Sequence, residues 1–161
     1  AGLTWRPRHN ITFIAEASYL DRDGWLLHQE NRNFTTFKVE QWEPSLSVDF
    51  FASATQQFRV VLQWVGLRAK EDEFFALEED GTALIPGPKP PGASDDFSIS
   101  QLNFQARYRW QIAPLSDLFV VYTKADSRDT EFKAFGDLFR DSWDQPISDQ
   151  LVIKLRYRFG S

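Results

Sequence analysis

The residues that could do chemistry in this 161-residue sequence are few, because it has two histidines and no cysteine. A hydrolase needs a nucleophile or an activated water beside a histidine and a carboxylate. His9 falls in a predicted turn, which leaves His28 with Ser18 as the best pair. The carboxylate of such a hydrolase site would come from Asp21 or Asp23. Because the sequence has no GxSxG, P-loop or HExxH motif, we predict a non-enzymatic protein with no catalytic residue and keep a hydrolase as an alternative.

Carboxylates gather between Lys70 and Asp80, where they could bind Ca²⁺. Their spacing does not match an EF-hand loop, which has a glycine at its sharp turn. The stretch from Asp21 to Gly24 also lacks the ligand series and is typical of a turn. The absence of cysteine excludes thiolate metal sites and disulfides. We therefore predict solvated acidic loops, with no metal ion and no cofactor.

Basic side chains form a second candidate site, since six of them alternate with apolar residues. They are Arg59, Arg107, Arg109, Lys154, Arg156 and Arg158. Rings of basic residues select anions, so this set predicts a cation-lined passage. The alternative is a hydrated, non-conducting interior in which Glu16, Glu40 and Asp49 balance the charge. Because the net charge is −5 and the basic residues are spread over many segments, we predict no nucleic-acid partner.

The elements that must position these residues are strands, as the last segment illustrates. Its apolar residues at every second position are Leu151, Ile153, Leu155, Tyr157 and Phe159. The basic residues between them point to the other side. Similar alternation predicts strands over residues 3–6, 11–20, 36–51, 57–69 and 97–110, and a segment that is apolar on both faces predicts a further strand over 117–125. No run approaches the roughly 20 apolar residues of a transmembrane helix.

One apolar and one charged face suit an all-β antiparallel transmembrane β-barrel with lipid outside and water inside. Connections alternate in length, with short ones at 7–10, 52–56 and 111–116, and long ones at 21–33, 70–96 and 126–148. This alternation is typical of outer-membrane barrels, which have short periplasmic turns and long extracellular loops. A soluble lipocalin-like barrel, whose apolar face lines a ligand cavity, is the alternative.

Seven strands is an odd number, whereas single-chain bacterial barrels close with an even one. We therefore predict that residues 1–161 are a C-terminal segment of a larger barrel, completed by missing upstream strands or by a partner chain. The other possibility is an eight-stranded barrel with an additional strand at 25–29 or 74–77. Between Glu131 and Trp143, apolar residues near helical spacing predict a short amphipathic helix that packs on the rim, caps the barrel mouth or docks a partner.

Aromatic residues fall near both ends of the predicted strands. The inner set is Trp5, Tyr108, Trp110, Tyr157 and Phe159, and the outer set contains Tyr19 and Trp25. Rings with polar tips favour the headgroup level of a membrane. We therefore predict two aromatic girdles in contact with outer-membrane lipid and lipopolysaccharide.

Two resemblances to known proteins support the same fold. The segment Leu151 to Phe159 looks like the C-terminal signal of outer-membrane proteins that the barrel assembly machinery reads. Gln63-Trp64, Trp5-Arg6-Pro7, Asp117 to Tyr122 and the last strand resemble the C-terminal barrel of a bacterial family of unassigned function. In that family, a domain similar to carbohydrate-binding family nine precedes the barrel. The resemblance implies an outer-membrane location, and it assigns no glycan role to residues of this sequence.

Overall fold

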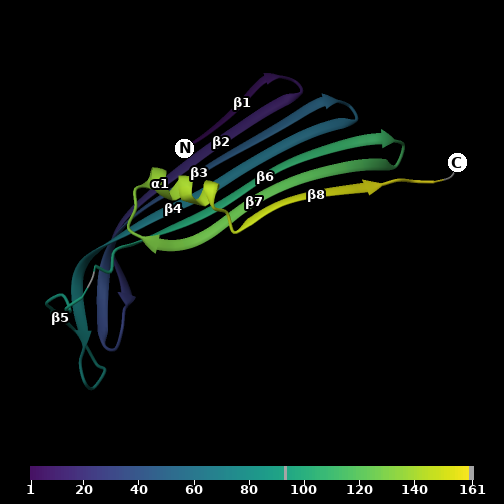
Figure 1. Ribbon diagram of the computed structural model, residues 1–161. Coiled ribbons are helices and arrows are strands. Elements are labelled where there is room, and N and C mark those ends of the chain that lie inside the picture. Colours follow the sequence, from purple (N-terminus) through teal and green to yellow (C-terminus); the bar gives the residue numbers. More distant parts are fainter. Residues whose placement is uncertain (93, 160–161) are drawn as a thin grey trace.

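An open antiparallel sheet forms most of the protein, as the computed structural model describes it for residues 1–92 and 94–159 (Figure 1). Its strands are β1 (Gly2–Arg8), β2 (Ile11–His28), β3 (Asn33–Ser53), β4 (Gln56–Leu77), β5 (Leu84–Gly87), β6 (Phe97–Ala113), β7 (Ser116–Glu131) and β8 (Ser148–Arg156). The strand order is β1-β2-β3-β4-β6-β7-β8, and β5 pairs with the far end of β4. The predicted all-β antiparallel class is therefore confirmed, and all seven predicted strands are present. The sheet is not closed, since β1 and β8 are its two edges.

The prediction of long loops at 21–33 and 70–96 is wrong for the first part of each range, because β2 and β4 continue into them. The strand β2 reaches His28, and β4 reaches Leu77. A β-bulge between Arg22 and Trp25 contains Gly24 at φ 73°, so the Asp-Gly signal bends a strand and does not end it. The segments considered as an eighth strand are thus extensions of β2 and β4. Figure 1 shows this outer part bending away from the main sheet.

The main sheet has an apolar face and a polar face, which follow from the period-two alternation of its strands. Registered partners across the strands form rows on each face. One row of the apolar face joins Trp5, Phe13, Val48, Val60, Ala106, Tyr122 and Leu151. The neighbouring row of the polar face joins Thr12, Asp49, Arg59, Arg107, Val121 and Val152. Much of the apolar face is exposed, reaching 65% at Ile153 and 61% at Leu155.

The buried core consists of two small clusters, which lie further from the short turns than the exposed part of the apolar face. In the outer part of β3 and β4, Phe37, Val39 and Ala69 are buried on the side of the polar face. Trp25 packs against this cluster, because the bulge that precedes it moves its side chain to that side. The second cluster joins Trp64 and Leu102 of the apolar face to the single helix of the described chain, α1 (Phe135–Asp144).

Candidate functional site

Aromatic side chains form an inner line across the apolar face, on the side of the short turns. Its members are Trp5, Phe13, Phe50, Phe58, Tyr108 and Trp110, and the line continues past the end of β8 to Tyr157 and Phe159. Trp5 and Phe13 are registered partners whose ring centroids lie 5.2 Å apart. Tyr108 lies one row nearer to the short turns than this pair, and Trp110 lies one row further still. The inner line therefore crosses the rows diagonally.

A second, outer line crosses the same face closer to the long connections. Its members are Tyr19, Trp42, Trp64, Phe104 and Tyr122. Tyr19 and Trp42 share a row, with ring centroids 5.0 Å apart. Trp64, Phe104 and Tyr122 each lie one row nearer to the short turns than the member before. The outer line is thus shifted across the rows in the same sense as the inner line.

The slopes of the two lines follow from the register. A row corresponds to two residues, about 6.6 Å along a strand, and neighbouring strands are about 4.8 Å apart. The inner line moves three rows over the six strand spacings from Trp5 to Tyr157, a slope of about 35°. The outer line moves three rows over the four spacings from Tyr19 to Tyr122, a slope of about 46°.

Only part of the outer line follows from sequence. Tyr19 was predicted there, whereas Trp25 is not a member because it packs on the other side of the sheet. Trp64, Phe104 and Tyr122 were assigned to strands without a role. Their alignment depends on which residues are partners across five strands, and a strand pattern read one segment at a time does not contain that information.

On the polar face, basic side chains surround buried and half-buried carboxylates. The Asp117 side chain is 2% exposed and accepts hydrogen bonds from Arg109 at 3.0 Å and from Arg156. Arg59 lies 3.8 Å from Asp49. Asp117 is the main counter-charge here, and the sequence analysis did not include it among the balancing carboxylates.

The other predicted basic residues lie close to this group. Arg107 is the registered partner of Arg59, so two positive charges are neighbours, and Lys154 is the partner of Phe119. Among the described residues, Arg107 and Lys154 form no ion pair. Arg158 follows the end of β8, and its backbone N–H donates to Ser116 Oγ at 3.0 Å. The half of the polar face on the side of the short turns therefore carries net positive charge.

Towards its middle, the polar face becomes acidic and amide-rich. A hollow of about 920 Å³ lies against it, and its lining includes Glu16, Glu43, Gln63, Gln101 and Asn103. The prediction that Glu40 balances the charge of this face is wrong. Glu40 lies on the other face, where it pairs with Arg68 at 3.3 Å.

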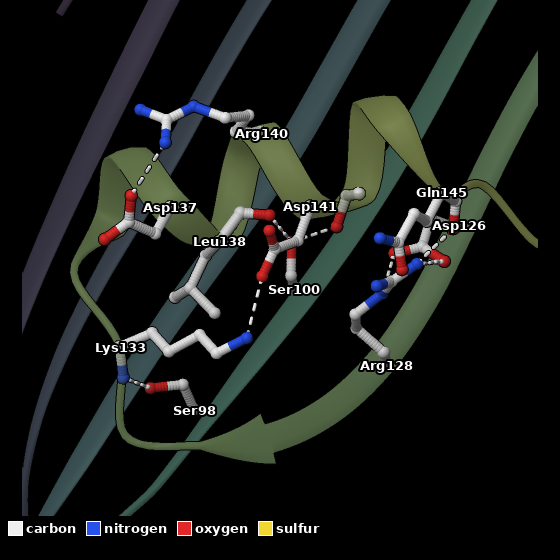
Figure 2. Close-up of polar contacts among 11 residues, drawn as sticks. Ser98, Ser100, Asp126, Arg128, Lys133, Asp137, Leu138, Arg140, Asp141 and Gln145 are labelled. Atoms are coloured by element: carbon white, nitrogen blue, oxygen red, sulfur yellow. Dashed lines mark hydrogen bonds and ion pairs between the residues drawn. The ribbon is translucent and has the colours of Figure 1, made fainter.

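The helix α1 packs on the apolar face, over β4, β6 and β7. This confirms the helix predicted between 131 and 143, although α1 ends one residue later, at Asp144. Ser100 Oγ is its main polar contact, since it lies 2.6 Å from Ser142 Oγ, donates to the Leu138 carbonyl at 3.3 Å and accepts from Trp64 Nε1 at 2.9 Å. Figure 2 shows Ser100 directly beneath the helix. A buried polar group of this kind fixes the position of a helix, because each group needs its partner.

Side chains from β7 and from the segment before α1 contact the second half of the helix. The helix has no basic residue in its last turn, and β7 supplies the missing donors. Lys124 donates to the Trp143 carbonyl at 3.0 Å, and Arg128 donates to the Gln145 carbonyl (Figure 2). From the segment that precedes the helix, the Lys133 ammonium donates to Asp141 in the last turn at 2.8 Å and holds the pKa of that carboxyl below its usual range.

The residues of the hydrolase alternative are not brought together. Ser18 donates to Glu43 at 2.9 Å, while His28 contacts the Asn31 carbonyl at 3.1 Å in the turn after β2. Ten residues of one strand separate Ser18 from His28, about 33 Å at 3.3 Å per residue. Among the residues that the structure describes, no three His, Cys, Asp or Glu side chains cluster as metal ligands would. In the same part of the chain, no helix is long and apolar enough to cross a membrane.

Fold and site together define an all-β protein whose open antiparallel sheet presents an exposed apolar face and a charged face. The sequence model of a family described as "Domain of unknown function (DUF5916)" matches residues 7–159, so the chain belongs to this family. This confirms membership of a family of unassigned function, as the resemblance implied. Searches of curated proteins and of solved structures gave no match.

Proposed function

We propose that this chain is a membrane-spanning part of an outer-membrane β-barrel, with its apolar face towards lipid and its polar face towards a water-filled interior. The observation that carries the proposal is the pair of aromatic lines, which cross the rows in the same sense. Strands of membrane barrels are tilted by about 35–45°, so a ring of residues at one membrane level must cross the hydrogen-bonded rows at about that angle. The slopes of about 35° and 46° agree with this requirement.

The distance between the two lines is comparable to the height of the apolar band that a barrel presents to lipid. Six residues separate Tyr19 from Phe13, and eight separate Trp42 from Phe50, which is about 20–26 Å along the strands. A tilt of about 40° reduces this to about 15–20 Å of height, and the rings at either end extend it towards the band of about 25 Å that barrels present to lipid. On this proposal, the open edges β1 and β8 pair with further strands, from the same polypeptide or from a partner chain.

The rival function, a soluble lipocalin-like barrel, requires the apolar face to line an internal cavity. The hollow of about 920 Å³ lies instead against the polar face, which favours a polar interior. Within that interior, the unpaired charges of Arg107 and Lys154 favour passage or surface binding of anionic solutes. We therefore prefer a non-enzymatic role in passage or binding.

Spin labels on two adjacent residues of β8 test the orientation. These 161 residues contain no cysteine that would compete with the introduced one for the label. In the complete protein inserted into phosphatidylcholine vesicles, a label at Leu155→Cys should be accessible to oxygen dissolved in lipid. A label at Lys154→Cys should be accessible to a water-soluble nickel complex. Equal accessibility of the two labels, or a protein that stays soluble without detergent, would refute the membrane assignment. Planar-bilayer recordings test the anion preference, which a closed or cation-selective barrel would contradict.

A further inference from the structure

The position of α1 relative to the outer aromatic line points to a second contact with the membrane. The helix lies over Trp64 and Leu102, and Trp143 contacts Phe104 with ring centroids 5.3 Å apart. It therefore crosses the outer line on the face that the proposed function assigns to lipid. At that level a membrane changes from acyl chains to headgroups.

The two sides of α1 differ in a way that suits this level. Leu138 is fully buried against the sheet. On the opposite side, Asp137 and Arg140 form an ion pair at 3.2 Å, with side chains 53% and 69% exposed (Figure 2). An amphipathic helix with one apolar and one charged side is typical of segments that lie in the plane of a membrane interface.

A cleft opens between the first half of α1 and the strands β3 and β4. Its volume is about 440 Å³, and its lining consists of Trp42, Pro44, Trp64, Phe135, Gly136 and Phe139. No charged side chain lines it. Trp42 and Pro44 belong to the apolar face, with Leu46 two residues further along the same strand, so the cleft is continuous with the exposed surface below it.

Glycine is required beside the cleft for a steric reason. A Cβ atom at Gly66 would lie 2.3 Å from Cη2 of Trp64 and 3.1 Å from Cδ1 of Phe135. The missing side chain lets the indole lie along β4, where Phe135 and Phe139 meet it edge-on at centroid distances of 6.3 and 5.6 Å. This arrangement forms the wall of the cleft.

We propose that α1 is an interfacial helix and that its cleft holds the upper part of an acyl chain of an outer-leaflet lipid. The inference rests on the proposed function, because only a lipid-facing sheet brings acyl chains to this place. An acyl chain matches the cleft because it is apolar along its length and needs no hydrogen-bond partner. The Asp137–Arg140 side then faces the zwitterionic or charged headgroups above.

Two helix positions test the inference in the complete protein, in vesicles of dilauroylphosphatidylcholine. A spin label at Phe139→Cys lies in the cleft, because the half-buried Phe139 side chain forms part of the cleft lining. It should be accessible to oxygen and protected from the nickel complex, as at Leu155→Cys. A label at Asp137→Cys should be accessible to the nickel complex. An unchanged near-ultraviolet circular dichroism spectrum confirms that both variants keep the helix packed.

The outcomes separate the two proposals. If Leu155→Cys reports lipid but Phe139→Cys is as accessible to nickel as Asp137→Cys, the interfacial helix is refuted and the barrel stands. If Leu155→Cys does not report lipid, both proposals fail. Cross-linking of Phe139→Cys to a second copy of the protein in the same vesicles would replace the acyl chain by a protein contact and overturn the inference.

Discussion

Replacing Gly66 by alanine should loosen α1 from the sheet. The new methyl group would lie 2.3 and 2.4 Å from two carbons of the Trp64 indole, whereas carbon atoms in contact are about 3.5–4.0 Å apart. The indole must therefore move by more than about 1 Å. It is 7% exposed and enclosed by Phe135 and Phe139, so it has little room to move without displacing the helix.

The expected loss of stability follows from the contacts of Trp64. Moving the indole breaks its hydrogen bond to Ser100, worth about 1 kcal/mol, and disturbs two edge-on aromatic contacts of about 0.5–1.5 kcal/mol each. Alanine recovers about 0.5–1 kcal/mol, because glycine is unfavourable inside a strand. We therefore expect a net destabilisation of about 1–3 kcal/mol, in the usual range for overpacking.

Urea unfolding of the vesicle-inserted protein, followed by tryptophan fluorescence, measures this difference. Gly87→Ala is the matched control, since a Cβ atom there meets nothing within 4 Å, and its stability should equal that of the parent or exceed it by up to about 1 kcal/mol. A Gly66→Ala protein as stable as the control, with an unchanged near-ultraviolet spectrum, would show that Trp64 does not hold the helix and would refute the reasoning.

Two further perturbations test the polar face and the helix contact. Asp117→Asn removes the charge that two guanidinium groups share, so it should lower the urea midpoint more than Asp49→Asn does. Asp49 has a single partner, Arg59, at 3.8 Å. Equal midpoints for the two variants would contradict this ranking. Lys133 lowers the folded-state pKa of Asp141. The pair therefore stabilises the helix at pH values above the ordinary aspartate pKa of about 3.9. This stabilisation is lost as the pH falls from there through the lowered pKa. In Lys133→Ala, acid titration monitored by near-ultraviolet circular dichroism should release α1 at higher pH than in the parent, and coincident curves would exclude a role for the pair.

Strand positions could be predicted from sequence because alternation is a local property. The segment from Leu102 to Trp110 places apolar residues at every second position, and its strand appears as expected. The extension of β2 could not be predicted in the same way. Its bulge shifts the parity between Arg22 and Trp25, so a chain that changes face looks like a loop when read as a simple alternation.

The candidate site depends even more on pairing between distant segments. A helix near Phe135 was expected from spacing, yet nothing in that spacing says that it covers Ser100 or that Trp64 lies beneath it. Gly66 illustrates the difficulty, since a glycine in a strand usually indicates a bulge or a close approach. Which of these applies depends on a ring two residues away and on a helix about 70 residues later in the chain.

The two faces of the sheet contribute to its stability in different ways. On the polar face, Asp117 is held by arginines from two other strands, so this charge helps to fix the register of β6, β7 and β8. On the apolar face, exposed residues such as Ile153 and Leu155 gain stability only where a nonpolar medium covers them. On the proposed function, a sheet that specifies its alignment by charges on one side and leaves most of the other side apolar is suited to a fluid, non-directional partner such as lipid.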